Sequence, residues 1–383
     1  DFKFTGRSEY EIPPPEIIIA AVDEKSLDRY GLWPWNRTVI ADFITQATRG
    51  GAAVIAFDVA FTDFDKNTTY QQTRQYVEAY RESQLLPESQ SIRSLTEQFE
   101  KLHAAQVQQA QAIADLEAAV ERSKGNAKTA AAKALKDTKL SADLTKNLLE
   151  QTQANITSWK RRSEEFYGLL NSNLETISPD AAMAKAVANS PQTILGYINY
   201  FDRKQVIGLS EDDIAANIKR IEPSTITEIY EETQIEVGGQ LIDQFSKLED
   251  IDLSEFEAGL EIVSIQAPLE QIANETAHFG FFNALPDPDG PLRQLPLLFR
   301  HKDRLYPSLA LKAAALYFDY EIHPLAGQLR ANTFSAIEFG GDLPVPTNEN
   351  AIQLINYYKD PAIYFPTFSL ADIIDGTVAP TTY

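Results

Sequence analysis

Residues 17–23 read IIIAAVD and residues 52–58 read AAVIAFD, two short apolar runs that each end on an aspartate. Continuous apolar runs of this length, rich in β-branched residues, are typical of buried strands in a parallel sheet. Between them, residues 38–49 carry apolar side chains at helical spacing and end at Gly50 and Gly51, a helix stop signal. The order strand, helix, strand predicts a right-handed βαβ unit.

A large helical insertion follows this unit. Residues 66–177 are rich in Ala, Gln, Glu and Lys, a composition that favours long helices. Seam positions recur three and four apart from Ile92 to Val120, with Gln106 and Gln109 as polar members, which indicates one arm of an antiparallel coiled coil. The second arm, residues 127–170, is expected to place these side chains in the seam: Leu135, Leu148, Ile156, Trp159 and Phe166.

The sheet resumes after the insertion, with a helix at residues 179–190 and a strand at residues 192–200. Residues 202–260 are acidic and carry helical patches at residues 210–221 and 239–248. Beyond them the patterns predict strands at residues 278–283, 292–300, 334–339 and 352–358, and helices at residues 307–320 and 370–374.

These patterns predict an α/β fold class, in which a mixed, largely parallel sheet with flanking helices is interrupted by a long antiparallel coiled-coil hairpin. The predicted α/β core is discontinuous and comprises residues 1–65 and 178–383. The hairpin insertion comprises residues 66–177.

Composition excludes several classes of function. The formal net charge of the 383 residues is -21, which argues against binding nucleic acid, because a polyanion requires a basic surface. The absence of cysteine excludes disulfides, thiolate zinc sites and cysteine nucleophiles. No apolar run is long enough to span a bilayer, and the sequence reads as part of a longer chain.

Asp23 and Asp58 close two strands that a single crossover joins, so both are expected at the carboxyl edge of the sheet, where ligands bind in open α/β folds. Two carboxylates at that edge suit a divalent cation such as Ca²⁺ or Mg²⁺, or a cationic ligand group. The alternative is that each aspartate caps the turn or helix that follows it. Both interpretations stand at the level of sequence.

The segment WPWNR at residues 33–37 is the second candidate site. Rigid aromatic side chains and an arginine are common anchors in recognition, so they can form the wall of a pocket. The structural alternative is packing of the two tryptophans, with Asn36 capping the next helix and Arg37 paired with Asp23 or Asp58. The candidate ligand-binding residues are therefore Asp23, Ser26, Trp33, Trp35, Arg37 and Asp58.

The case for an enzyme is weak. The four histidines lack metal-ligand spacing, and neither a glycine-rich phosphate loop nor a nucleophile elbow is present. Asp287 and Asp289 lie in PDPDG, which lacks the other ligands of a calcium loop and favours a tight turn. A metal-dependent hydrolase would rest on Asp23 and Asp58 alone. We therefore expect no catalytic residues in this domain.

Three groups of motifs nevertheless resemble a known family. They are VDEKSL (22–27), GLWPWNR (31–37) and GGAAVIAFDVAF (50–61); GFFN (280–283), DPDGPLR (287–293) and YPSLA (306–310); and LINY (354–357) with FSLADII (368–374). In these motifs the chain resembles the second type of CHASE domain, a sensory extracellular module associated with cyclases and histidine kinases. The resemblance covers both ends of the chain and omits the hairpin and the acidic middle.

This resemblance implies an extracytoplasmic sensor, placed after one transmembrane helix and before several more, that regulates a cytoplasmic adenylate cyclase, histidine kinase or protein kinase. It implies neither a cofactor nor established ligand-contacting residues. The signal is an unknown small molecule or protein. The hairpin departs from the compact family pattern, so the alternative function is a scaffold that binds a protein partner or forms a homodimer.

Overall fold

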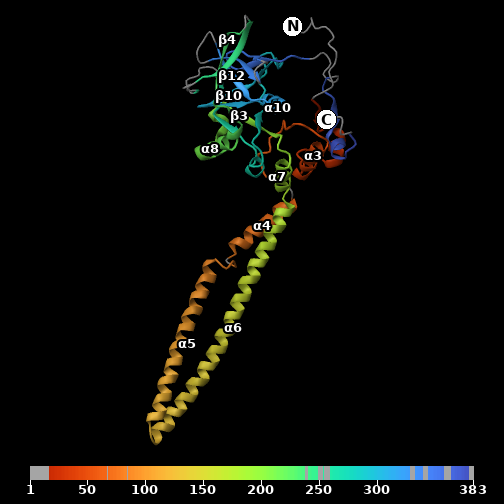
Figure 1. Ribbon diagram of the computed structural model, residues 1–383. Coiled ribbons are helices and arrows are strands. Elements are labelled where there is room, and N and C mark those ends of the chain that lie inside the picture. The colour runs from red at the N-terminus through yellow and green to blue at the C-terminus, as the bar shows by residue number, and fades with distance from the viewer. Residues whose placement is uncertain are drawn as a thin grey trace. The chain divides into compact units, whose positions relative to one another are not determined.

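The computed structural model describes residues 17–66, 68–83, 85–237, 240–248, 253, 259–327, 333–339, 344–357 and 364–378. The chain divides into two compact units, Asp1–Asp65 with Pro179–Tyr383, and Lys66–Ser178 (Figure 1). The α/β fold class predicted from the sequence is confirmed, with parallel strand pairings, flanking helices and a long helix pair. Within the described ranges, no helix combines the length and apolar character needed to cross a membrane.

The centre of the first unit is strand β3 (Thr193–Tyr200). It pairs in parallel with β2 (Ile55–Ala56) and β8 (Phe279–Phe281), and antiparallel with β7 (Ser264–Gln266). The first five residues of β3 are all buried, which explains the continuous apolar character that identified this strand in the sequence.

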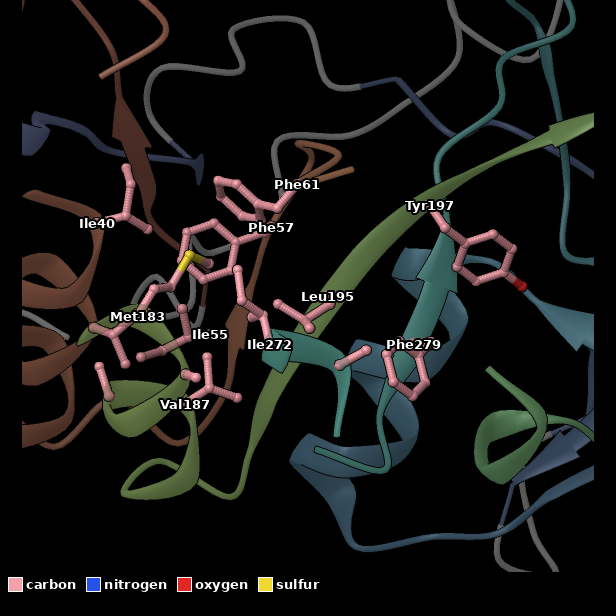
Figure 2. Packing of buried hydrophobic residues seen from close by; sticks show 14 of the residues in the cluster. Ile40, Ile55, Phe57, Phe61, Met183, Val187, Leu195, Tyr197, Ile272 and Phe279 are labelled. Atoms are coloured by element: carbon pink, nitrogen blue, oxygen red, sulfur yellow. The ribbon is translucent and has the colours of Figure 1, made fainter. Parts of the chain in front are cut away.

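Helices α3 (Arg37–Arg49) and α7 (Pro179–Ala188) pack against each other and contribute to the main core. Figure 2 shows Met183 and Val187 of α7 beside Ile55 and Leu195 of the sheet. Helix α10 (Leu309–Phe318) packs on β8 and β3, and α9 (Glu270–Ala273) packs on α7.

The first strand corrects the predicted βαβ unit. Strand β1 (Ile19–Ala21) pairs in parallel with β16 (Thr367–Ser369), whereas β2 pairs with β3. The two strands predicted to be joined by one crossover therefore lie in separate sheets, with α2 (Glu24–Tyr30) following β1 directly. Strand identity was readable from local apolar content, but the pairing depended on a partner almost 350 residues downstream.

A second sheet has the order β14-β13-β12-β4-β5 and is mostly antiparallel. The β4–β5 hairpin of this sheet lies in the acidic region, and so does helix α8 (Glu211–Arg220). The helical patch predicted at residues 239–248 is wrong, because residues 240–247 form β5 against β4. The strands of this sheet are β14 (Val345–Pro346), β13 (Phe334–Phe339), β12 (Ile322–Ala326), β4 (Tyr230–Val237) and β5 (Gln240–Lys247).

Short strands complete the first unit. Strand β10 lies between β11 and β6, and β9 pairs with β15. Helix α12 (Leu370–Ile374) follows β16 directly. The bounds of these strands are β6 (Leu260–Glu261), β9 (Gln294–Pro296), β10 (Leu298–His301), β11 (Arg304–Pro307) and β15 (Ile352–Leu354).

The second unit contains α4 (Thr68–Glu82), α5 (Gln90–Arg122) and α6 (Asn126–Ile177). Helices α5 and α6 run antiparallel from the turn at residues 123–125 (Figure 1). The predicted seam of α6 needs correction, because Leu148 is 65% exposed and Leu149 only 6%. The buried seam of α6 passes through Thr145 instead. Because this residue is polar, the apolar pattern of the sequence did not reveal the seam.

Replacing Gly280 by alanine tests how closely α10 packs on the sheet. A Cβ atom at Gly280 would lie 2.5 Å from the Cα atom of Leu309, a backbone atom that cannot move aside. We expect Gly280→Ala to lower the free energy of unfolding by about 1–3 kcal/mol, measured by urea denaturation. Gly168 in α6 has open space around it, so Gly168→Ala should be neutral or stabilising by up to ~1 kcal/mol. Equal effects of the two substitutions would contradict the close packing.

Candidate functional site

Asp23 caps helix α2 and anchors a small polar network. Its Oδ1 atom accepts the backbone N–H of Ser26 at 3.0 Å and the hydroxyl of Ser369 at 2.8 Å. The Oγ atom of Ser26 lies 2.9 Å from that of Ser369 and accepts the N–H of Ala371 at 3.1 Å. Because Ser369 donates to the carboxylate, its oxygen accepts the proton of Ser26. The hydrogen bonds thus run in one direction, from Ala371 to Asp23.

The parallel pairing of β1 with β16 produces this network, since it places the first turns of α2 and α12 side by side. The hydroxyl of Ser26 caps α12 from a different part of the chain, a role that Ser369 at the cap position does not take. Two ion pairs, Lys25–Asp372 and Arg29–Asp375, extend the contact along the helices. We call Asp23, Ser26, Ser369 and Ala371 the helix-start network.

The network lowers the pKa of Asp23. Hydrogen bonds from Ser26 and Ser369 favour the ionised form of its carboxyl and hold its pKa below the ordinary value. The capping interpretation from the sequence accounts for this carboxylate. Ser26, another candidate ligand-binding residue, is completely buried and engaged in the same network.

The two candidate tryptophans pack together. Trp35 is 6% exposed, and its ring centroid lies 5.3 Å from the centroids of both Tyr30 and Trp33. Its indole N–H donates to the carbonyl oxygen of Gly31 at 2.7 Å. Trp33 is 37% exposed and is the member of this cluster that is open to solvent. The packing interpretation therefore accounts for Trp35, and any ligand contact falls to Trp33.

The sequence suggested that Arg37 pairs with Asp23 or Asp58. In the structure it contacts other acidic residues instead. Its Nη1 atom lies 3.1 Å from Oδ1 of Asp180, and its Nη2 atom donates to the carbonyl oxygen of Asp63. Its backbone N–H donates to Oδ2 of Asp65 at 2.7 Å. The expected cap by Asn36 is present, with Oδ1 accepting the N–H of Thr38 at 2.9 Å.

The Arg37 cluster is buried and charged. Asp180 is fully buried, and its Oδ2 atom accepts the N–H of Asp65 at 3.1 Å. Burial raises the pKa of Asp180 and lowers the pKa of Arg37, and the ion pair opposes both shifts. The Nη1 atom of Arg37 and the Oδ1 atom of Asp180 are not aligned for a hydrogen bond, so the attraction between the two side chains is mainly coulombic. Sequence reasoning missed Asp65 and Asp180, which flank the insertion on either side.

Asp58 lies apart from both clusters. It is exposed in the loop after β2, and partial desolvation by neighbouring atoms raises the pKa of its carboxyl. Within the part of the chain that the structure describes, no group of three or more histidine or acidic side chains can hold a metal ion. A cation shared by Asp23 and Asp58 stays a prediction. Asp287 and Asp289 both bind Arg293 in a tight turn.

The comparisons with known proteins identify a family and nothing closer. The family model described as CHASE2 domain matches residues 1–383. No curated protein matches the sequence, and no solved structure matches it. The site can therefore be interpreted only from its own geometry.

We expect Ser26→Ala to destabilise the first unit by about 1–3 kcal/mol at pH 7, because it leaves the N–H of Ala371 without its acceptor. The stabilisation linked to Asp23 depends on a lowered pKa, so it is complete above the pKa of the unfolded state and is lost as the pH falls through the folded-state value. The difference between the two proteins in urea denaturation should therefore shrink below about pH 4. Ser94→Ala, on the exposed surface of α5, is the control. A pH-independent difference would remove Asp23 from the network.

The Arg37–Asp180 pair predicts strong coupling between two substitutions. Arg37→Met should cost about 3–5 kcal/mol, because it leaves the carboxylate of Asp180 buried without a counter-charge. The double variant Arg37→Met/Asp180→Leu should be more stable than Arg37→Met, as measured by denaturation at pH 7. Because burial raises the pKa of Asp180, its protonation on acidification should also recover part of the loss in Arg37→Met. Additive effects of the two substitutions would exclude the pairing.

Proposed function

The chain belongs to the CHASE2 domain family, and we propose that it is the extracytoplasmic signal-input domain of a bacterial transmembrane receptor. CHASE2 domains are sensory modules of receptors and are not catalytic. The proposed output is a cytoplasmic adenylate cyclase, histidine kinase or protein kinase. The proposed signal is a small molecule or a protein that binds the first unit.

The observation that carries this proposal is the contact between the beginning and the end of the first unit. Residues 19–30 and residues 367–375 meet through β1–β16 pairing, the helix-start network and two ion pairs. A sensor must convert a shift between two conformations into movement of the segments that leave the domain. One shared contact allows a change in the core to act on both of those segments together.

The membrane side of the domain can be tested by labelling. The sequence contains no cysteine, so Leu32→Cys introduces a single thiol at a position that is 87% exposed. We expect a membrane-impermeant maleimide to label this variant of the full-length protein in intact spheroplasts, in a background without other cysteines. Labelling that requires permeabilised membranes would place the domain in the cytoplasm and contradict the proposal.

The role of the terminal contact can be tested through the output. Lys25→Glu should alter the basal output of the full-length receptor, because it sets two acids against each other at the α2–α12 contact. The charge exchange Lys25→Glu/Asp372→Lys should restore it. The matched control is Arg203→Glu, which breaks the exposed ion pair with Glu211 away from this contact. The measurement is cyclic nucleotide production or phosphotransfer in isolated membranes, and equal effects of Lys25→Glu and Arg203→Glu would refute the coupling.

A further inference from the structure

Three polar side chains in the interior of the first unit are buried without a partner from the chain. Tyr197 is 1% exposed, Asn199 2% and Tyr306 0%. Within the part of the chain that the structure describes, neither tyrosine hydroxyl has a hydrogen-bond partner, and neither polar atom of the Asn199 amide has one. Buried polar groups in folded proteins are nearly always paired. These three side chains therefore indicate a binding partner that is not part of the protein.

Tyr197 and Asn199 project from the same face of β3, because they are two residues apart in one strand. Figure 2 shows the hydroxyl of Tyr197 pointing away from Phe57 and Phe61. The backbone of Asn199 is already engaged, since its N–H donates to Oδ1 of Asn283 at 2.7 Å and its carbonyl accepts from Nδ2 of Asn283 at 3.0 Å. Asn283 thus fixes the strand at this point, and only the side chain of Asn199 is left to bind something else.

An aromatic pair borders this face of β3. The rings of Phe281 and Phe299 lie 4.2 Å apart between centroids. The ring of Tyr197 lies 6.4 Å from Phe281, and that of Phe201, just after β3, lies 5.0 Å from Phe299. Asn199 lies between Tyr197 and Phe201 in the sequence, so its amide is set beside the same aromatic pair.

Tyr306 of β11 reaches this place from another part of the chain. It is the cross-strand partner of Phe299, so the two side chains share one face of the β10–β11 hairpin. Phe281 forms a bridge with Ser308, two residues after Tyr306. The hydroxyls of Tyr306 and Tyr197 are close enough to interact electrostatically. We call Tyr197, Asn199 and Tyr306 the core polar site.

The chemistry of the core polar site favours an uncharged ligand. Burial raises the pKa of Tyr197 well above its ordinary value, and the nearby Tyr306 adds to this shift. Burial also raises the pKa of Tyr306 to about 12. Both hydroxyls therefore keep their protons at neutral pH, and each can donate and accept a hydrogen bond. The rings of Phe281 and Phe299 carry no charge, so an ion would lose its hydration here at a high cost.

We propose that the core polar site binds a small uncharged molecule that both donates and accepts hydrogen bonds. Such a molecule would pair the two hydroxyls and the amide, and so remove the cost of burying them unpaired. Water and a small organic alcohol or amide share this chemistry. Only an organic occupant would bear on the proposed sensory role, so the site can be tested without the receptor.

Removing each hydroxyl tests occupancy, because the sign of the effect depends on it. If the site is occupied, Tyr197→Phe and Tyr306→Phe should each lower the folding equilibrium constant by about 5-fold in urea denaturation. If the hydroxyls are unpaired, each substitution should raise it, because a desolvation cost disappears. Tyr200→Phe, which loses a hydrogen bond of 2.8 Å to Gln266, should also lower it. Tyr317→Phe, at a residue that is 44% exposed, should change nothing.

The double variant Tyr197→Phe/Tyr306→Phe tests whether both hydroxyls bind the same molecule. Loss of either hydroxyl weakens the binding of that molecule, so the second substitution should cost less than the first. The combined fall in the equilibrium constant should therefore be smaller than the product of the two single effects. Effects that multiply, or a rise in stability in either single variant, would overturn the proposal.

Two further measurements on the 383-residue protein distinguish the occupants. Native mass spectrometry would show an organic molecule as an added mass that the double variant lacks. Nuclear Overhauser effects between water and the side-chain amide of Asn199 would show bound water. Either result supports the proposal, and the absence of both would overturn it.

Discussion

The buried pair of Arg37 with Asp180 is the interaction on which the arrangement of the first unit depends. The chain leaves this unit at Asp65 and returns at Pro179 after the whole helical insertion. The side chain of Asp180 accepts the N–H of Asp65, and that of Asp65 accepts the N–H of Arg37. The start of α3 therefore binds both ends of the interruption. This contact offsets part of the loop-closure entropy that the insertion costs when β2 pairs with β3.

The same unit is closed a second time where its first and last strands meet. The β1–β16 pair is short, and most of the polar contact belongs to the helix-start network behind it. In this network the buried Ser26, which lies in the helix after β1, caps the helix that follows β16. Two helices that share their capping groups cannot separate without leaving donors unpaired, so their movements are coupled. This property suits a domain whose family is sensory.

The contacts within the second unit are less apolar than those of the first unit's core. Its helix pair is long, but the seam includes Gln106, Gln109 and Thr145, and the larger apolar side chains of α6 lie partly outside it. Polar seam residues set the register of two helices at a cost in stability. Leucines outside the seam can contribute only if another surface covers them.

The sequence by itself determined what depends on neighbours along the chain. The strand at residues 193–200, helix α3 and the Asn36 cap follow from apolar spacing or from a contact two residues away, and these local signals were sufficient. Only the tertiary structure decided that Arg37 binds Asp180, that Ser26 meets Ser369, that β1 pairs with β16, and that α6 buries Leu149 and exposes Leu148. Each of these depends on which distant segment returns to the same place. A polar side chain, or the apolar face of a helix, can pair with several distant segments. Only the folded chain decides which of these segments lies within reach.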